Sequence, residues 1–400
     1  MADTPWLTLI GLGEDGADGL SPAARGALDA AEVVAGADRH LSLLPAALRA
    51  EILRWPVPFE DGIARLLAHR GRRVVMLASG DPFHFGAGVS IARHLAPGEW
   101  RAIPAPSTFS LAAARLGWAL QDTPCLGLHA APLQRLRPHM LPGGRAIVLL
   151  RDGAAAGKLA EYIYKQGFGD STLYVMEALG GPRERIRQAC ADTFALTDIA
   201  HPVVIPVSFS GEGRVLPRAS GIADDWFDHD GQITKRPARA LTLSALAPRP
   251  GELLWDIGAG SGSVAIEWLL AHTANRAIAF EGDPVRAGRA RANAAALGAD
   301  RLTVVEGRAP GILAGQPMPD ALFIGGGLSQ DLLDALWATL PMGTRLVANA
   351  VTLESEALLA AWHAARGGQL LRVDLAEAAP LGTRRGWKAA YPLVQWTVVL

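Results

Sequence analysis

The chain has 400 residues, half of them hydrophobic, with a formal net charge of −1 at pH 7. This length predicts two or three domains, and the balanced charge argues against general affinity for nucleic acid or membranes. Two distant cysteines, Cys125 and Cys190, argue against a disulfide framework or a zinc site, so we expect no metal. We see no signal peptide and no apolar run of about 20 residues, and we therefore expect a cytoplasmic protein.

The first half alternates strand and helix patterns, which predicts an α/β fold with a parallel sheet between helices. Up to about residue 115, the predicted strands are Trp6–Ile10, Val33–Ala35 and Arg73–Ala78. The predicted helices begin at Ser21-Pro22 or cover Asp61–His69 and Ala87–Leu95. From about 120 to 210 we expect a second α/β lobe with strands Ala146–Leu150, Leu173–Glu177 and Pro202–Ser208 and a helix over Lys158–Gln166.

A polar, glycine-rich segment at 211–231 predicts a linker between a first domain at 1–210 and a second at 232–400. The second domain has the pattern of a seven-stranded α/β sheet. Its strands are Leu253–Asp256, Ala277–Phe280, Leu302–Glu306, Ala321–Ile324, Arg345–Ala348, Leu370–Leu375 and Val394–Val399. The last two are joined through 380–386 without a helix pattern, which predicts a hairpin pair at the sheet edge.

A glycine-rich loop follows the strand that ends in Asp256, with glycine at alternate positions before a helix. The motif D-x-G-x-G-x-G resembles the cofactor loop of Rossmann-like, class I methyltransferases that use S-adenosylmethionine. Glycine lets the backbone approach a ligand, and a helix N-terminus suits its carboxylate. Glu281 ends the next strand, where an acid can accept hydrogen bonds from two ribose hydroxyls. The expected cofactor contacts are Asp256, Gly258, Ala259, Gly260, Ser261, Gly262 and Glu281.

A different glycine loop, residues 11–16, formally matches the dinucleotide fingerprint G-x-G-x-x-G. Its helix begins only after Ser21, and the second strand ends in Gly36 rather than in an acid. Both features argue against NAD or FAD binding. The loop is then either a structural turn or part of another cofactor site.

Two later loops favour the other cofactor site. They are Ser79–Gly86, which contains G-D-P-x-x-x-G, and Pro104–Thr108. With the first loop they resemble a tetrapyrrole methylase domain over residues 6–210, although Glu14 replaces a usual proline and Ala105 a usual glycine. The resemblance implies S-adenosylmethionine contacts at Gly11, Gly13, Gly80, Asp81, His84, Ser107 and Thr108. An ordinary turn at Asp81-Pro82 and a helix N-cap at Ser107 are the structural alternatives.

Three segments of the second half resemble the decarboxylating precorrin methylases. Ile233-Thr234-Lys235 is similar to the segment that caps the cofactor in that family, which implies a contact at Thr234. Gly307, Arg308 and Ala309 stand where the family contacts adenine. Gly325, Gly326 and Gly327 end the fourth strand and either leave room for a large flat substrate or form a flexible loop.

The two halves together resemble the CobL-type precorrin-6Y C(5,15)-methyltransferases (decarboxylating), in which a CbiE-like domain precedes a CbiT-like domain. The resemblance implies methylation of precorrin-6B at carbons 5 and 15 and loss of the ring C acetate carboxyl, giving precorrin-8X in cobalamin biosynthesis. The first half would methylate carbon 5, and the second would methylate carbon 15 and decarboxylate. Each half would hold one S-adenosylmethionine, and related methylases imply a homodimer or homotetramer.

Arginine suits a substrate rich in carboxylates, and only four lysines occur in the chain. Lys235, Arg239, Arg384 and Arg385 are candidate substrate contacts, each with a solvated surface charge as the alternative. The sequence identifies no catalytic residue and does not distinguish a metal-free from a cobalt-containing substrate. A nicotinamide-dependent reductase, a fusion acting on another tetrapyrrole, and a non-catalytic carrier remain as alternatives.

Overall fold

The computed structural model describes residues 5–46 and 48–400. The chain divides into two compact units. The first unit comprises Met1–Ala131 and His139–Arg214, and the second comprises Pro132–Pro138 and Val215–Leu400. Among the described residues, we find no helix with the length and apolar character needed to cross a membrane.

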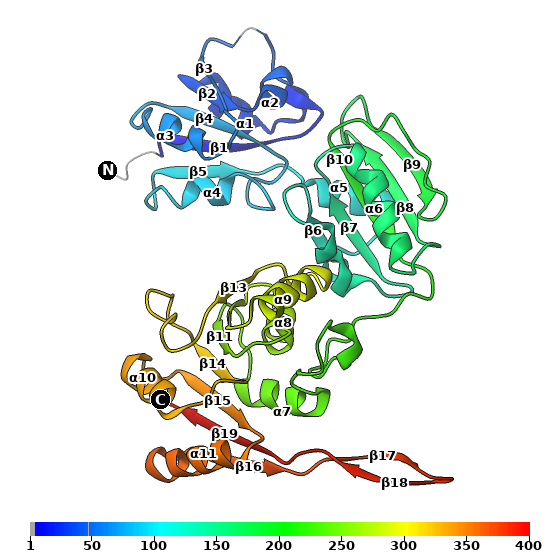
Figure 1. Cartoon of the computed structure of the whole chain (residues 1–400). Coiled ribbons are helices and arrows are strands. Elements are labelled where there is room, and N and C mark those ends of the chain that lie inside the picture. Colours follow the sequence, from blue (N-terminus) through cyan, green and yellow to red (C-terminus); the bar gives the residue numbers. More distant parts are fainter. Residues whose placement is uncertain (1–4, 47) are drawn as a thin grey trace. The chain divides into compact units, whose positions relative to one another are not determined.

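The first unit begins with a five-stranded parallel sheet in the order β3-β2-β4-β1-β5 (Figure 1). Its strands are β1 (Leu7–Leu12), β2 (Val33–Gly36), β3 (Glu51–Arg54), β4 (Val74–Ser79) and β5 (Trp100–Ile103). Its helices are η1 (Gly16–Gly19), α1 (Pro22–Asp29), α2 (Asp38–Ser42), α3 (Asp61–Leu67) and α4 (Gly88–Ala92). Strand β1 lies between β4 and β5 and is buried throughout, because its alternate side chains enter two different cores on the two faces of the sheet.

A second, mixed sheet follows in the same unit, in the order β6-β7-β10-β8-β9. Its strands are β6 (Cys125–Gly127), β7 (Arg145–Leu149), β8 (Thr172–Glu177), β9 (Arg185–Cys190) and β10 (Val203–Ser208). Its helices are α5 (Thr108–Leu116), η2 (Leu120–Asp122) and α6 (Ala154–Lys165). This confirms a second α/β lobe. The sequence pattern misses β3, β5, β6 and β9, which are short or expose polar side chains.

The second unit contains the predicted seven-stranded sheet, in the order β13-β12-β11-β14-β15-β19-β16. Its strands are β11 (Leu253–Ile257), β12 (Arg276–Glu281), β13 (Leu302–Glu306), β14 (Ala321–Ile324), β15 (Arg345–Ala350), β16 (Gln369–Val373) and β19 (Leu393–Val399). The first five are parallel, and β19 is antiparallel to both β15 and β16. The α/β class and the methyltransferase sheet are therefore confirmed.

The predicted hairpin needs one correction. Strands β16 and β19 do pair at the sheet edge, but they are not joined by a simple turn. Between them, β17 (Ala376–Leu381) and β18 (Arg384–Ala389) pair with each other as a separate two-stranded arm. Figure 1 shows this arm extending beyond the end of the larger sheet. A loop pattern rich in Pro, Gly and Arg hides these strands, since neither of their faces is buried.

Helices cover both faces of the seven-stranded sheet. Alternate residues of β11 therefore enter two different cores. Trp255 packs with α10 (Gln330–Thr339) and α11 (Leu353–Arg366). Leu254 packs with α7 (Arg236–Leu246), α8 (Ser263–Ala271) and α9 (Pro284–Ala296). A parallel strand buried on both faces explains the continuous apolar run in the sequence.

Two segments outside the sheet also pack within the second unit. Leu216, Ile222 and Phe227, from the segment predicted as a linker, enter the core beside α7 and α8, and η4 (Asp224–Trp226) lies among them. Residues 132–138 form most of η3 (Leu133–His139) and belong to this unit as well. Arg135 donates to both carboxylate oxygens of Asp300, at 2.8 and 3.0 Å.

Candidate cofactor sites in the two units

In the second unit, the glycine loop after β11 has a backbone that side chains would disturb. Gly258, Gly260 and Gly262 have φ values of 69°, 56° and 75°, in the left-handed region that favours glycine. At Gly258, an added Cβ would lie 2.6 Å from the Cα of Gly326. The triple-glycine segment after β14 thus packs directly against this loop, which gives it a packing role in addition to any role toward a substrate.

Two acids lie beneath and beside this loop. Asp256 is fully buried, and its Oδ2 accepts from the Ala265 amide at 3.1 Å while its Oδ1 has no hydrogen-bond partner among the described residues. Burial raises the pKa of Asp256 to about 7, and the negative charge of Glu281 adds to this effect. Glu281 accepts from the Gly260 amide at 2.7 Å and from the Asp283 amide at 2.9 Å. A buried, unpartnered oxygen under a glycine cradle suits a polar cofactor group.

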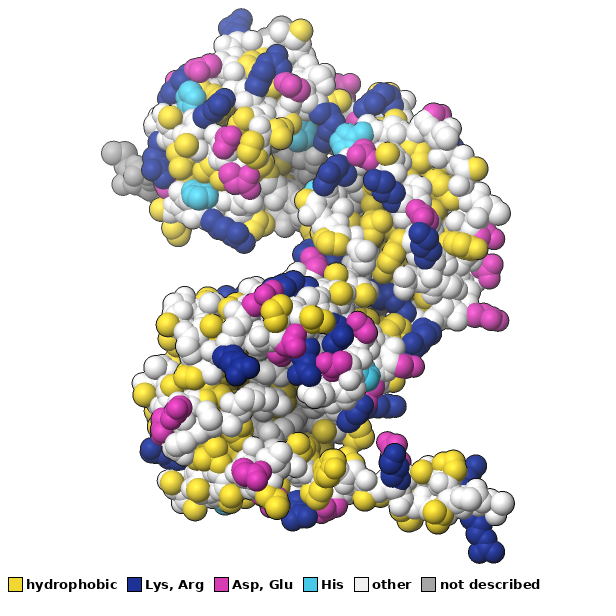
Figure 2. Space-filling view, in the orientation of Figure 1, with side chains coloured by type: hydrophobic (Ala, Val, Ile, Leu, Met, Phe, Trp, Pro, Cys, Tyr) yellow, Lys and Arg dark blue, Asp and Glu magenta, His cyan; other side chains and the backbone are white. Residues whose placement is uncertain are grey.

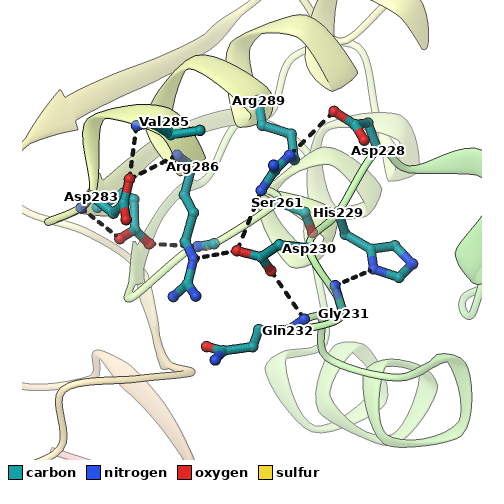
Figure 3. A network of polar contacts seen from close by, with 12 residues as sticks. Asp228, His229, Asp230, Gly231, Gln232, Ser261, Asp283, Val285, Arg286 and Arg289 are labelled. Atoms are coloured by element: carbon teal, nitrogen blue, oxygen red, sulfur yellow. Dashed lines mark hydrogen bonds and ion pairs between the residues drawn. The ribbon is translucent and has the colours of Figure 1, made fainter.

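Helix α9 contacts both the glycine loop and the segment before α7, and Figure 3 shows from close by its Arg286 and Arg289 beside Asp230 and Asp228. Asn293 donates to the carbonyls of Ser261, at 3.0 Å, and Asp228, at 2.9 Å, and it accepts from the Asp228 amide. Arg286 Nε donates to Asp230 at 2.8 Å. Arg289 lies between Asp228 and Asp230, at 3.2 and 3.4 Å. One helix therefore fixes both the glycine loop and the chain that leads to Thr234.

The segment at Thr234 and Lys235 leads into α7, and Lys235 is its N-cap residue. Lys235 is more than half exposed and stays available to a ligand, with Asp224 at 3.9 Å. The prediction that Arg239 contacts substrate is wrong. Its side chain is 0% exposed, donates to Glu267 at 2.6 Å and to the carbonyls of Ile222 and Thr234, and packs over Phe227. A buried, fully paired guanidinium holds the fold together.

The remaining predicted contacts of this unit lie at other strand ends. Gly307 follows β13, and its amide donates to the Glu281 carbonyl at 2.9 Å, which places Gly307, Arg308 and Ala309 next to the acid. Arg384 and Arg385 are exposed on the β17–β18 arm. Figure 2 shows basic and apolar side chains together on this arm, where Trp387 is 79% exposed.

In the first unit, the predicted cofactor loops line a cavity of about 420 Å³. Its lining includes Gly13, Gly80, Asp81, His84, Ser107 and Thr108. Gly11 lies where three loops meet, because an added Cβ would be 1.9 Å from the Gly80 carbonyl oxygen and 2.4 Å from the Ala105 amide. The sequence places these residues far apart, and the parallel strands β1, β4 and β5 bring them to one sheet edge.

Several of these residues also have the local structural roles that the sequence left as alternatives. Asp81 accepts from the Phe83 amide at 2.8 Å, which makes an Asx turn. Ser107 caps α5 by accepting from the Ser110 amide at 3.1 Å. His84 Nδ1 lies 3.3 Å from Ser107 Oγ, and its ring packs on Phe109. These roles fix the loops around the cavity and do not exclude ligand contacts.

Sequence reasoning misses an ion-paired group on the same cavity. Glu14, only 8% exposed, accepts from Arg183 at 2.8 Å and from Arg39. Arg39 also donates to Ser79 Oγ at 2.5 Å. Burial and the charge of Arg39 lower the pKa of His40 to about 4, so this histidine is neutral at pH 7. The only signal is the unusual Glu14 in the first loop, since its partners come from distant segments.

Fold and sites together define a methyltransferase with a tetrapyrrole-methylase half and a class I half. The family Tetrapyrrole (Corrin/Porphyrin) Methylases matches residues 6–195, and the family Precorrin methyltransferase domain matches residues 225–400. Methyltransferases of these families take their methyl group from S-adenosylmethionine. The described residues contain no group of three or more His, Cys, Asp or Glu side chains that could hold a metal ion.

Three relatives that align with 98% of the chain all carry the same name. Precorrin-6Y C(5,15)-methyltransferase [decarboxylating] from Sinorhizobium sp. is 52% identical over 98% of this chain and 96% of its own length. The chain belongs to this family. A probable cobalt-precorrin-6B C(15)-methyltransferase (decarboxylating) from Saccharolobus solfataricus is 34% identical over 34% of this chain and 71% of its own length. A cobalt-precorrin-7 C(5)-methyltransferase from Salmonella typhimurium is 29% identical over 45% of this chain and 88% of its own length.

Proposed function

We propose that this chain transfers methyl groups from S-adenosylmethionine to carbons 5 and 15 of precorrin-6B and removes the ring C acetate carboxyl as carbon dioxide, giving precorrin-8X. The observation that supports this most is that one chain has two candidate cofactor sites of different construction, a glycine loop after β11 and a cavity in the first unit. The first unit methylates carbon 5, and the second methylates carbon 15 and decarboxylates. Two relatives whose names each state one of these reactions match only part of the chain, 45% and 34% of it, which supports a division of the reactions between its parts.

In the second unit, the residues at the strand ends fit S-adenosylmethionine. Gly258 to Gly262 approach it with backbone alone, and Asp256 Oδ1 and Glu281 offer acceptors for its amino and ribose groups. Thr234 caps it, and the backbone of Gly307 to Ala309 borders its adenine. The cofactor supplies an already activated methyl group, so the protein has mainly to hold a macrocycle carbon in line with it.

In the first unit, the cavity loops take the same cofactor. Gly11 keeps the loops after β1, β4 and β5 in backbone contact, and Gly80, Asp81, His84, Ser107 and Thr108 face the cavity. The conjugated macrocycle provides its own electrons at the carbon that is methylated.

Decarboxylation in the second unit likewise requires few catalytic side chains, because the macrocycle accepts the electron pair. The carbon–carboxyl bond breaks, its electron pair is delocalised into the macrocycle, and the remaining methylene carbon then takes up a proton with that pair and becomes a methyl group. The triple glycine at 325–327 leaves space beside the cofactor loop, and the exposed Lys235 is available to bind a substrate carboxylate. Arg384 and Arg385 extend from the arm and bind other carboxylates of the ring.

The test is incubation of the purified full chain with metal-free precorrin-6B and methyl-labelled S-adenosylmethionine, read by mass spectrometry. We expect a product that has gained two methyl groups and lost one carbon dioxide. Unchanged substrate mass, in the presence of measured cofactor binding, would refute the substrate assignment for the metal-free macrocycle. A parallel incubation with the cobalt form then tests the other substrate.

Self-association into a dimer or tetramer is also part of the proposal. The exposed apolar side chains of the β17–β18 arm, Leu381 at 70% and Trp387 at 79%, support it, since isolated strands with such side chains favour pairing. Light scattering on the full chain should give a mass of at least two chains. A monomeric mass at micromolar concentration would contradict this part of the proposal.

A further inference from the structure

The rim of the first unit's cavity carries nitrogen-bearing side chains that have no assigned role. Arg39 comes from α2, His129 from the loop after β6, Arg151 from the loop after β7, and His201 from just before β10. Below them the lining is largely apolar, with Leu12, Met76, Leu77, Phe109, Met176 and Val204. The cavity therefore combines an apolar floor with a nitrogen-rich rim.

Arg151 differs from the other arginine of this rim. Arg39 is compensated by the buried carboxylate of Glu14. Arg151 makes one hydrogen bond, from Nε to the His129 carbonyl at 3.0 Å, and forms no ion pair among the described residues. That bond orients the guanidinium and leaves its Nη donors free. A positioned, uncompensated guanidinium on a cavity rim suits an incoming carboxylate.

The two histidines complete the arrangement. His129 Nδ1 is buried without a hydrogen-bond partner among the described residues. His201 is bonded to the backbone of Arg151, and burial together with the charge of Arg39 lowers its pKa. Burial and the charge of Arg151 likewise lower the pKa of His129. The lowered pKa favours the neutral form of both imidazoles. A neutral imidazole has one N–H, and that of His201 is directed to the Arg151 backbone, so His129 is the ring that keeps a donor for a ligand while His201 holds Arg151 in place.

We infer that Arg151 and His129, with His201 holding the Arg151 backbone, form a carboxylate cradle that binds an acetate or propionate side chain of the macrocyclic substrate, while the apolar lining takes the edge of the ring. This inference rests on the proposed function and names substrate contacts within its first site. S-adenosylmethionine also has a carboxylate, but the predicted cofactor loops all follow strands of the first sheet. The cradle residues belong to the second sheet, since His129 and Arg151 follow β6 and β7 and His201 precedes β10, and they line the same cavity as the cofactor loops.

The first arm of the test measures binding without turnover. The full chain is titrated with a porphyrin octacarboxylate and with the matching octaamide, which keeps the ring and removes the charges. Wild type should prefer the octacarboxylate, and Arg151→Gln should weaken its binding about tenfold or more while leaving the octaamide unchanged. Arg151→Lys should keep part of the preference. Arg65→Gln, an exposed arginine outside the cavity, is the matched control.

The second arm measures turnover and cofactor affinity. Arg151→Gln should raise the KM for carbon 5 methylation about tenfold and leave carbon 15 methylation and S-adenosylmethionine affinity at wild-type values. Wild-type octacarboxylate binding in Arg151→Gln would overturn the cradle. A fall in cofactor affinity would assign Arg151 to the cofactor and also overturn it. Carboxylate preference that depends on Arg151, without any methylation by wild type, would support the cradle and refute the proposed function.

Discussion

The two units build their candidate sites in different ways. In the second unit, one contiguous loop, Gly258 to Gly262, makes most of the site, and α9 holds it through Asn293. In the first unit, the site is a cavity lined from both sheets and stiffened by Glu14 between two arginines. The first kind of site depends on local backbone geometry, and the second on contacts between distant segments. Substitutions should therefore affect the two methylations separately.

The largest expected effect comes from adding one methyl group to a glycine in each unit. A Cβ at Gly258 meets Gly326 at 2.6 Å on a left-handed backbone, and a Cβ at Gly11 meets the Gly80 oxygen at 1.9 Å. The clash and the backbone strain at Gly258 cost about 4 kcal/mol together, so Gly258→Ala should lower carbon 15 methylation about 1,000-fold. Gly11→Ala should lower carbon 5 methylation by a similar factor.

Product masses separate these two outcomes, because each variant should release a product with a single added methyl group. Gly157→Ala is the control, since nothing lies within 4 Å of its new Cβ. The comparison between the units fails if either glycine variant reduces both methylations equally while circular dichroism shows a folded chain.

The difference between the units also decides what sequence alone can predict. The seven-stranded sheet and the positions of Asp256 in β11 and Glu281 at the end of β12 follow from local sequence patterns, since a strand, a glycine turn and a helix each show in a short stretch of sequence. The pairing of Glu14 with Arg183 spans 169 residues, and no local pattern indicates it. Arg239 has the appearance of a surface charge in sequence because its partner Glu267 lies in another helix. The β17–β18 arm is missed because it has no buried face to impose an alternating pattern.

Asp256→Asn should give the next largest effect, as a change in the pH dependence of stability. The pKa of Asp256 is about 7 in the folded chain against 3.8 for an unperturbed aspartate, so the folded state binds more protons between these values. Wild-type stability attributable to this group therefore falls as pH rises from about 4 to 7. Without cofactor, Asp256→Asn should be more stable than wild type at pH 8 by about 4 kcal/mol and nearly equal at pH 4.

Denaturant unfolding at the two pH values checks this expectation, with the first unit as the internal reference where its transition is resolved. The same variant should bind S-adenosylmethionine more weakly in the second unit, because the amide presents an N–H in place of an acceptor. Equal stability of wild type and Asp256→Asn at pH 8 would show that ionisation of the buried Asp256 carboxyl does not destabilise the folded chain.

Asn293→Ala should have a smaller effect, on cofactor affinity, and tests whether α9 holds the glycine loop in place. The change removes the hydrogen bonds that hold the Ser261 carbonyl and the Asp228 backbone. Loss of these buried bonds costs about 2 kcal/mol, so cofactor affinity in the second unit should fall about tenfold to thirtyfold. Calorimetric titration should show unchanged affinity in the first unit. A decrease in thermal stability without any change in cofactor affinity would limit Asn293 to a folding role.

The smallest expected effect lies on the exposed arm. Replacing Arg384 and Arg385 together by glutamine should raise the KM for carbon 15 methylation about threefold, because exposed charge pairs contribute about 0.2–1 kcal/mol each. Initial rates at several substrate concentrations measure this change, with Arg249→Gln as a surface control in the same unit. An unchanged KM would show that the two arginines are only solvated surface charges and do not bind the substrate.

The central claim is that the chain has two independent cofactor sites, one in each unit. Calorimetric titration of the full chain with S-adenosylmethionine tests it most directly. We expect two bound molecules per wild-type chain, and one per chain in both Gly11→Ala and Gly258→Ala. A single bound molecule per wild-type chain, or the loss of both from one glycine substitution in a folded protein, would contradict the account.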